Sequence, residues 1–434
     1  MRPKYLQKIK NDFIVFEQLD NSLHHVYRIQ MTSFEPPRFL DKKSQPHTFT
    51  LVVLASISAM AMNIFLPSLP SMADHFSTST ATLGLTVGIY LAASAVIGIF
   101  VGPISDLYGR RPVILVSLAV FIISSIWCIY ASTVFWLLTA RVFQACGAVT
   151  IVLSRAVIRD TTEANLAGSK IGYVTMGMAL VPMVAPGIGG FIDAYLSWEY
   201  NFWALAIAGL ITFILVFFDL GETAVNRSSS IFEQFNDYPT LLKSRRFWAY
   251  SITSGLGAGA FFAYLGGAPY VASEVFYLSP EKLGVFFGAP AIGYFVGNFL
   301  AGRFSTQVGI DPMISIGMFI NVSGMLLSIA ISIMGFGSEW SFFGTMTLVG
   351  LGNGISLPNA NAGLLSINPK LAGTASGLGG SIMIGLGSIL SAMAGILLAG
   401  SSTEIPLIGL MLISALLGLL CTFYVIKRNN ELTG

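Results

Sequence analysis

The chain has 434 residues, of which 54% are hydrophobic and 10% charged, and its formal net charge is +2. Soluble globular proteins carry roughly 25% charged residues, so these few charges could not cover the surface of a soluble chain of this length. The composition therefore excludes an ordinary soluble enzyme and a disordered protein. The near-neutral balance also offers no basic surface to a nucleic acid.

Residues 1–47 form a polar segment of mixed charge, without the continuous apolar run of a signal peptide. Two interpretations stay open for it. It is a small cytoplasmic extension, which can be disordered, or translation starts at Met31 and most of the segment does not belong to the protein. We assign it no function.

Twelve apolar runs follow, each long enough to cross the roughly 30 Å hydrocarbon core of a bilayer as a helix. A backbone in lipid must satisfy its own hydrogen bonds, so all twelve are predicted to be helical. Lysine and arginine gather in alternate loops, which predicts that these loops and both chain ends face the cytoplasm. The approximate limits of the runs are 48–70, 80–104, 112–131, 134–157, 168–192, 198–219, 248–272, 282–305, 311–335, 341–366, 371–399 and 405–426.

The longest polar stretch between runs, residues 221–247, predicts a cytoplasmic linker between two bundles of six helices, 48–220 and 248–427, followed by a tail at 428–434. A faint repeat supports duplication, because GPISDLYG (102–109) and GRFSTQVG (302–309) follow the second run of each half. Matched bundles are typical of transporters whose halves rock about a central site. A channel or a membrane-embedded enzyme is the alternative.

The loop after the second run combines turn-forming glycines with charges: Gly102, Asp106, Gly109, Arg110 and Arg111. Glycine permits a tight turn, and Asp106 can make charge-assisted bonds to Arg110 or to a neighbouring helix end. We predict a conformational latch that forms in one state and breaks in another, with a static clamp as the alternative. The spacing closely resembles the cytoplasmic signature of the major facilitator superfamily, G-x-x-x-D-x-x-G-R-[RK].

Arg141 is the one cation well inside a predicted span, about 10 Å from the start of the run 134–157, and Gln144 follows it by three residues. An arginine within the membrane is costly, so it marks a functional site by default. Satisfaction by Gln144 and backbone carbonyls is the alternative. The segment resembles the superfamily's R-x-x-Q-G motif, although Ala145 and Cys146 stand between Gln144 and Gly147.

The fifth run carries Pro182, Pro186, Gly189 and Gly190. Each proline removes a backbone donor and is expected to kink the helix, and the glycines admit a partner helix closely. The segment resembles the antiporter-type signature ending P-x-x-G-G of the superfamily's drug exporters. A kinked packing helix without bearing on transport direction is the alternative.

Further segments narrow this resemblance to bacterial exporters of the bicyclomycin and chloramphenicol resistance type, over about residues 48–427. The segments are NIFLP (63–67), SRAVIRD (154–160), APYV (268–271) and LPNANA (357–362). The resemblance implies an all-α major facilitator fold in a bacterial inner membrane. It also implies proton-driven export of small molecules by alternating access, with no cofactor or metal and no enzymatic activity.

Asn63 departs from this pattern, because the subgroup usually places an acidic residue there. Asparagine hydrogen-bonds but cannot titrate, so the usual proton carrier is missing. Three readings stay open: coupling through Asp106, Asp219 or Glu274, facilitated diffusion or solute exchange, or an anionic group of the substrate bound by Arg141. Proton-coupled export is the favoured one.

A central pocket for amphiphilic molecules is expected where aromatic and amide side chains lie beside helix breakers or polar groups. An interruption at Pro358 is expected to leave backbone carbonyls free in that pocket. The candidates are Tyr90, Tyr264, Tyr270, Tyr294, Asn359 and Asn361. A sugar or metabolite permease without proton coupling is the runner-up function, a membrane-embedded enzyme the rival of another class, and a structural or sensor protein a third option. We expect a monomer, because its GxxxG spacings suit packing within one chain.

Overall fold

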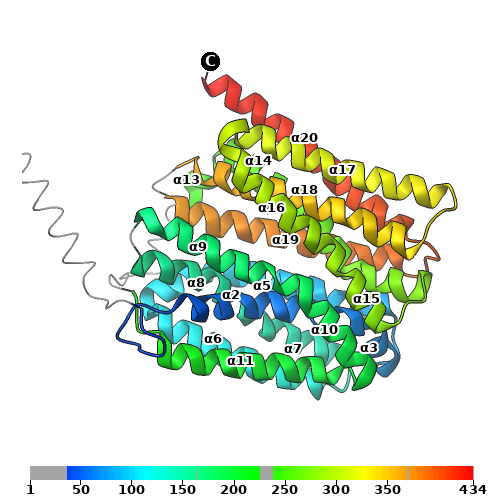
Figure 1. Ribbon diagram of the computed structural model, residues 1–434, viewed down its shortest axis with the longest axis horizontal. Helices are drawn as coiled ribbons and strands as arrows, with labels where there is room; N and C mark the ends of the chain where they lie inside the picture. Colours follow the sequence, from blue (N-terminus) through cyan, green and yellow to red (C-terminus); the bar gives the residue numbers. More distant parts are fainter. Residues whose placement is uncertain (1–36, 163, 225–237, 369–370, 434) are drawn as a thin grey trace, which may run out of the picture.

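The computed structural model describes residues 37–162, 164–224, 238–368 and 371–433. Long helices lie side by side in two groups, one from blue to green in Figure 1 and the other from green to red. We call the helices of residues 48–224 the N half and those of residues 238–433 the C half. Residues 1–36 and 225–237, which make up most of the predicted extension and part of the predicted linker, lie outside the described residues.

Each half contains six membrane spans, several of them built from two or three helical pieces. The N half has α2 (Thr48–Asn63) with η1 (Leu66–Ser68) and α3 (Leu69–His75), α4 (Thr80–Leu83) with α5 (Leu85–Tyr108), α6 (Arg110–Ile129), α7 (Val134–Gln144) with η2 (Ala145–Gly147) and α8 (Ala148–Thr161), α9 (Ala164–Ala179) with α10 (Val181–Tyr195), and α11 (Glu199–Asp219). After the short α13 (Tyr238–Leu242), the C half has α14 (Arg245–Tyr270) with η3 (Val271–Val275), α15 (Pro280–Phe286) with α16 (Gly288–Val308), α17 (Ile310–Ile333), α18 (Glu339–Leu365), α19 (Ala372–Leu398) and α20 (Ile405–Thr433).

The predicted number of spans is confirmed. Ten helical stretches of the described chain are long and apolar enough to cross a membrane. The remaining two spans are α14 and α18, which are 26 and 27 residues long but contain more glycine and polar side chains. Two ends differ from the prediction, since the first span continues to His75 and α20 continues to Thr433 through most of the expected tail.

Prolines have two different effects on these helices. The fifth span breaks at Leu180, directly before Val181 and Pro182. This break is expected because proline lacks a backbone N–H and its ring crowds the preceding turn. Pro358, by contrast, lies inside the continuous α18. The predicted interruption of that helix is therefore wrong, because one missing N–H is tolerated where the helix is packed on several sides.

The described part of the polar segment before α2 is tied to the end of α11. Asp219 is fully buried, and its two carboxylate oxygens accept hydrogen bonds from the backbone N–H of Leu40 (2.7 Å) and of His47 (2.9 Å). Ser44, also fully buried, closes the intervening turn. Residues 37–47 therefore pack as part of the N half, and the carboxylate that ends α11 serves as an anchor.

Replacement of Asp219 by alanine is expected to lower the apparent unfolding temperature of the purified protein. Two buried N–H groups would lose their acceptor, and each costs about 1–3 kcal/mol when left unsatisfied. Asp219→Asn keeps one acceptor oxygen and should lose less. Asp41→Ala, in the same turn, should change little, because its carboxylate accepts only an exposed hydrogen bond, from the N–H of Lys43 (3.0 Å), which water can replace. Equal unfolding temperatures for wild type and Asp219→Ala would contradict the anchoring role.

The two halves meet most closely at one face of the molecule. We call the face with α3 and α15 the distal face, and the face with both ends of the described chain the terminal face (Figure 1). Near the distal face, a Cβ atom added at Gly190 of α10 would lie 2.3 Å from the carbonyl oxygen of Pro280, and one at Gly284 of α15 would lie 2.5 Å from that of Pro186. Backbone thus touches backbone across the halves.

Toward the terminal face this contact is lost. α5 and α19 are still in contact where Ser388 donates a hydrogen bond to the carbonyl of Gly88 (2.8 Å), and where a Cβ atom added at Gly98 would lie 2.8 Å from the Ser381 hydroxyl. Further along, a Cβ atom added at Gly102 of α5 or Gly377 of α19 would meet no heavy atom of the described residues within 4 Å. α9 and α16 continue the spans of α10 and α15 toward the terminal face. Cβ atoms added there at Gly172 and Gly302 would also meet no heavy atom of the described residues within 4 Å. The halves are therefore closed at the distal face and separated at the terminal face.

Candidate functional site

A charge cluster lies at the terminal face of the N half, at the predicted latch. The Arg110 guanidinium pairs with Asp106 of α5, and its Nε donates to Asp160 of α8 at 3.1 Å. One arginine thereby joins the second, third and fourth spans. Arg111 instead contacts α11, where it donates to the carbonyl of Phe217 (3.0 Å) and lies over its ring.

Gly109 makes this cluster possible because it turns the chain with φ +98°, a conformation that side chains rarely adopt. The turn brings Glu222, just after α11, beside the start of α6. One oxygen of Glu222 accepts from the backbone N–H of Arg110 at 2.9 Å and also from those of Thr223 and Ala224. A Cβ atom added at Gly109 would overlap the Glu222 carboxylate at 2.2 Å.

The corresponding turn of the C half has the same backbone but a different chemistry. Gly309 has φ +97°, which matches Gly109 and agrees with the sequence repeat. Here Asp311 accepts hydrogen bonds from Tyr250 (2.8 Å) and Asn429 (2.7 Å), which joins α14, α17 and α20. A pocket of about 830 Å³ lies beside this network, and its lining includes Asn359.

Arg141 is fully buried in the N half. Its guanidinium lies between two rings, with its carbon atom 4.3 Å from the centre of Phe65 and 4.5 Å from that of Tyr90. It donates to the carbonyl of Ala61 at 3.0 Å and to Gln144, which in turn donates to Ser125 at 2.7 Å. Because α2 ends at Asn63, the Ala61 carbonyl belongs to a last turn whose carbonyls lack helical partners.

The described residues place no carboxylate on this buried arginine. Asn63 is 4% exposed, and its side chain donates to the carbonyl of Ala59 in its own helix (2.7 Å). Carbonyls, an amide and two aromatic faces compensate the guanidinium instead, while its Nη2 has no hydrogen-bond partner in the described part of the chain. Such an arginine holds the first, second and fourth spans together, which favours the packing alternative over a substrate-binding role.

The three acids considered for coupling lie in three different settings. Asp106 is paired with Arg110, Asp219 anchors the segment before α2, and Glu274 is exposed in η3. A further acid, Asp193 of α10, is half-buried near the distal face and accepts from Ser71 at 2.6 Å. Sequence reasoning missed Asp193, because it lies just beyond the predicted end of the fifth run.

The six pocket candidates do not gather in one place. Tyr90 belongs to the Arg141 site and bonds Ser58 (2.9 Å), while Tyr264 is buried among phenylalanines of the C half. Tyr270 donates to the carbonyl of Ser401 at 3.0 Å. The expected pair of deep amides is also absent from the described residues, since Asn359 is buried and bonds its own helix whereas Asn361 is exposed.

Tyr294, the remaining candidate, leads to Arg155, which lies in the segment SRAVIRD (154–160) but was not assigned to a site from the sequence. Tyr294 lies on α16 of the C half, and it interacts electrostatically with Arg155 on α8 of the N half. Arg155 is exposed, although protein atoms crowd it. The predicted run ended at 157 and placed Arg155 at its margin, but α8 continues to Thr161.

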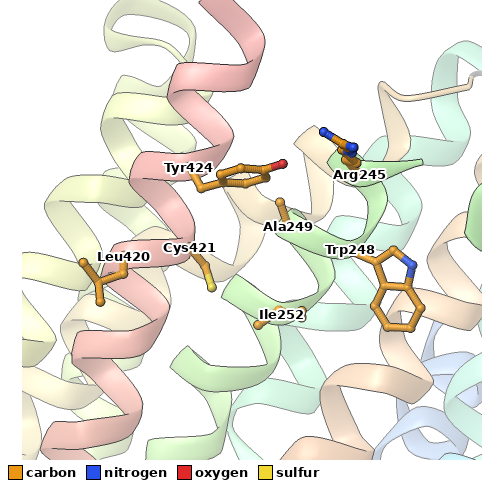
Figure 2. A pocket seen from close by; sticks show the side chains of 7 residues that line it. All are labelled: Arg245, Trp248, Ala249, Ile252, Leu420, Cys421 and Tyr424. Atoms are coloured by element: carbon orange, nitrogen blue, oxygen red, sulfur yellow. The ribbon is translucent and has the colours of Figure 1, made fainter. Parts of the chain in front are cut away.

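A second pocket lies between α14 and α20 near the terminal face (Figure 2). Its volume is about 430 Å³, and Trp248, Ile252, Leu420 and Tyr424 are among its lining residues. Three of these side chains are at least 40% exposed. A shallow, largely apolar groove of this kind suits lipid chains, so we do not assign the transport path to it.

Comparison with known proteins agrees with this architecture. A family model described as the Major Facilitator Superfamily matches residues 51–392. The chain is 27% identical to a bicyclomycin resistance protein homolog of Haemophilus influenzae, with 89% of this chain and 97% of that protein covered. It is 28% identical to a chloramphenicol resistance protein of Pseudomonas aeruginosa, with 84% and 87% covered.

Among solved structures, the fold is similar to that of a bacterial homolog of the human lysosomal transporter Spinster in an inward-facing and occupied conformation. The TM-score is 0.69 at 16% identity, and 88% of this chain and 96% of that chain are covered. At this identity the likeness concerns the fold alone. The family match over most of the chain, together with two six-span halves, shows that the protein belongs to the major facilitator superfamily of membrane transporters.

Proposed function

We propose that this protein is a secondary active exporter that moves small amphiphilic molecules, including drugs, out of a bacterial cell by proton antiport. The observation that carries the proposal is the difference between the two ends of the contact between the halves. The halves touch through glycines at the distal face and are separated at the terminal face. Rocking of the halves would exchange these two conditions and give alternating access. The relatives named for bicyclomycin and chloramphenicol resistance support the substrate class.

The proposed orientation places the terminal face in the cytoplasm of the inner membrane. Arg110, Arg111, Arg159, Arg245 and Arg246 lie toward this face, and such an excess of cations is expected on the cytoplasmic side. The domain limits 48–220, 221–247 and 248–427 stay our proposal for the two rocking bodies and their linker. We propose that the protein acts as a monomer, because Gly293 and Gly297 pack on α18 of the same chain.

The latch remains part of this proposal. In the present arrangement Arg110 is held inside the N half by Asp106 and Asp160. Closure at the terminal face would bring the last turn of α5, which contains Asp106, toward the start of α19. The start of a helix is the end that attracts a carboxylate. The charge cluster would then exchange partners between the two conformations.

The proposal is tested by efflux from proteoliposomes that contain the purified protein. With chloramphenicol as the substrate, an imposed proton gradient is expected to drive movement against the substrate gradient, and an uncoupler should abolish it. Protein-free vesicles are the control. Downhill movement that ignores the proton gradient would favour a facilitator, and no movement of chloramphenicol or of a wider drug panel would contradict drug export.

A further inference from the structure

Arg155 differs in its surroundings from Arg141 and Arg110, which also belong to the N half. Arg141 is compensated by carbonyls and rings, and Arg110 by two carboxylates. Among the described residues, Arg155 has no ion pair and no hydrogen bond. It lies about 9 Å from the end of α8, six residues before Thr161. An arginine this far inside a membrane helix marks a functional site by default, and an exposed one is free to take a partner from outside the chain.

The side of α8 that carries Arg155 is the side that solvent reaches. Ile151 is half-buried and Arg155 and Arg159 are exposed, and these residues are four apart and share one face of the helix. The intervening Ala156, Val157 and Ile158 are buried. A face turned to lipid would carry large apolar side chains here instead of two arginines. The accessible face of α8 is therefore turned toward the space between the halves.

The C half contributes a polar group on the opposite side. Tyr294 of α16 is close enough to Arg155 to interact with it electrostatically, and Asn298 lies one turn further along α16. Within the described ranges, the other charged group that acts on Arg155 is Arg159, which has the same sign. A guanidinium fork with a phenol opposite is suited to an oxyanion, because both groups donate hydrogen bonds and only the guanidinium is charged.

We propose that Arg155, with the Tyr294 hydroxyl, binds a negatively charged group such as a carboxylate or sulfonate on the transported molecule. This inference rests on the proposed export function and narrows its substrate class from amphiphilic molecules in general to anionic or zwitterionic ones. The two residues belong to opposite halves, so the anion would bridge them while the terminal face is open.

The test compares two fluorescent probes that differ in charge alone, dansylglycine and its neutral amide, dansylglycinamide. Binding to the full-length protein in detergent is followed by the dansyl fluorescence. Wild type is expected to bind the anion about tenfold more tightly or better, since one hydrogen bond to a charged group is worth about that factor or more. Arg155→Gln should remove the preference, Arg155→Lys should keep part of it, and Tyr294→Phe should reduce it.

Arg159→Gln is the matched control, because it removes an exposed arginine one turn away on the same face, and the preference should survive it. The inference is overturned if wild type shows no preference, if Arg155→Gln weakens both probes equally, or if Arg159→Gln has the same effect as Arg155→Gln. Nanodiscs of phosphatidylcholine with and without phosphatidylglycerol separate the sources of the anion. Loss of dansylglycine binding in the presence of phosphatidylglycerol would identify a lipid headgroup site and overturn the substrate assignment.

Efflux of the same two probes from proteoliposomes distinguishes this inference from the export function. Selective binding of dansylglycine without its movement would leave the anion site in place and contradict export. Movement of both probes at equal rates, unaffected by Arg155→Gln, would support export and contradict the anion site.

Discussion

Replacement of Arg141 by alanine is expected to abolish efflux and to lower the apparent unfolding temperature strongly. The change would leave the Ala61 carbonyl and Gln144 without their donor inside the N half, at about 1–3 kcal/mol for each unsatisfied group. It would also remove the cation from between Phe65 and Tyr90, a contact worth about 2 kcal/mol when desolvated. Efflux from proteoliposomes and thermal unfolding in detergent measure the two effects.

Arg141→Lys provides the matched control for this prediction. Lysine keeps the charge, but it lacks the planar fork that both stacks on rings and donates in two directions. We expect partial recovery of the unfolding temperature and little recovery of efflux. Wild-type efflux by Arg141→Ala would remove this residue from the functional site, and an unchanged unfolding temperature would show that the surrounding contacts contribute little.

Replacement of Gly190 by alanine is expected to reduce efflux by about tenfold or more. The added methyl group would lie 2.3 Å from the carbonyl oxygen of Pro280 in the other half, where backbone cannot yield without separating α10 from α15. Overpacking of this kind costs about 1–3 kcal/mol, and about 1.4 kcal/mol changes a conformational equilibrium tenfold. The cost applies only while the distal face is closed, so the variant would favour the arrangement open at that face.

Gly187→Ala is the matched control, since an added Cβ there would lie 3.9 Å from the nearest atom, the carbonyl oxygen of Gly284. Its efflux should stay within about twofold of wild type, because 3.9 Å is an ordinary packing distance. Spin labels at Tyr195 and Lys282 would report the separation of the distal ends of α10 and α15. Unchanged label distances and normal efflux in Gly190→Ala would contradict the closure that we infer.

The sequence predicted the spans well and the site only in part, for physical reasons. Hydropathy and length are properties of one segment, so the twelve runs could be found without knowing their neighbours. Glycine turns are similarly local, and the match of Gly109 with Gly309 was visible as a repeat. Arg141 could be located by its cost in lipid, but its rings could not, because Phe65 and Tyr90 belong to two other spans.

The surroundings of two acids and one arginine could not be predicted from the sequence. Asp219 was a candidate for coupling, and its partners Leu40 and His47 lie more than 170 residues away in the chain. Asp193 and Arg155 were passed over because predicted helix ends are uncertain by several residues, and both lie within that margin. The exposure of Arg155 on α8 and its electrostatic interaction with Tyr294 of the other half depend on the folded arrangement, so the sequence alone could not show them.

Tyr238, at the start of α13, forms a bond that reaches back across the molecule. Pro103 has no N–H to donate to the carbonyl of Ile99, and the Tyr238 hydroxyl donates to that carbonyl at 3.2 Å. Burial raises the pKa of Tyr238, which keeps this proton in place. The first helix of the C half, α13, is thus bonded to α5 of the N half. A rotation of one half relative to the other would either carry α13 along with α5 or break this hydrogen bond, so opening further at the terminal face would cost about 0.5–1.5 kcal/mol more.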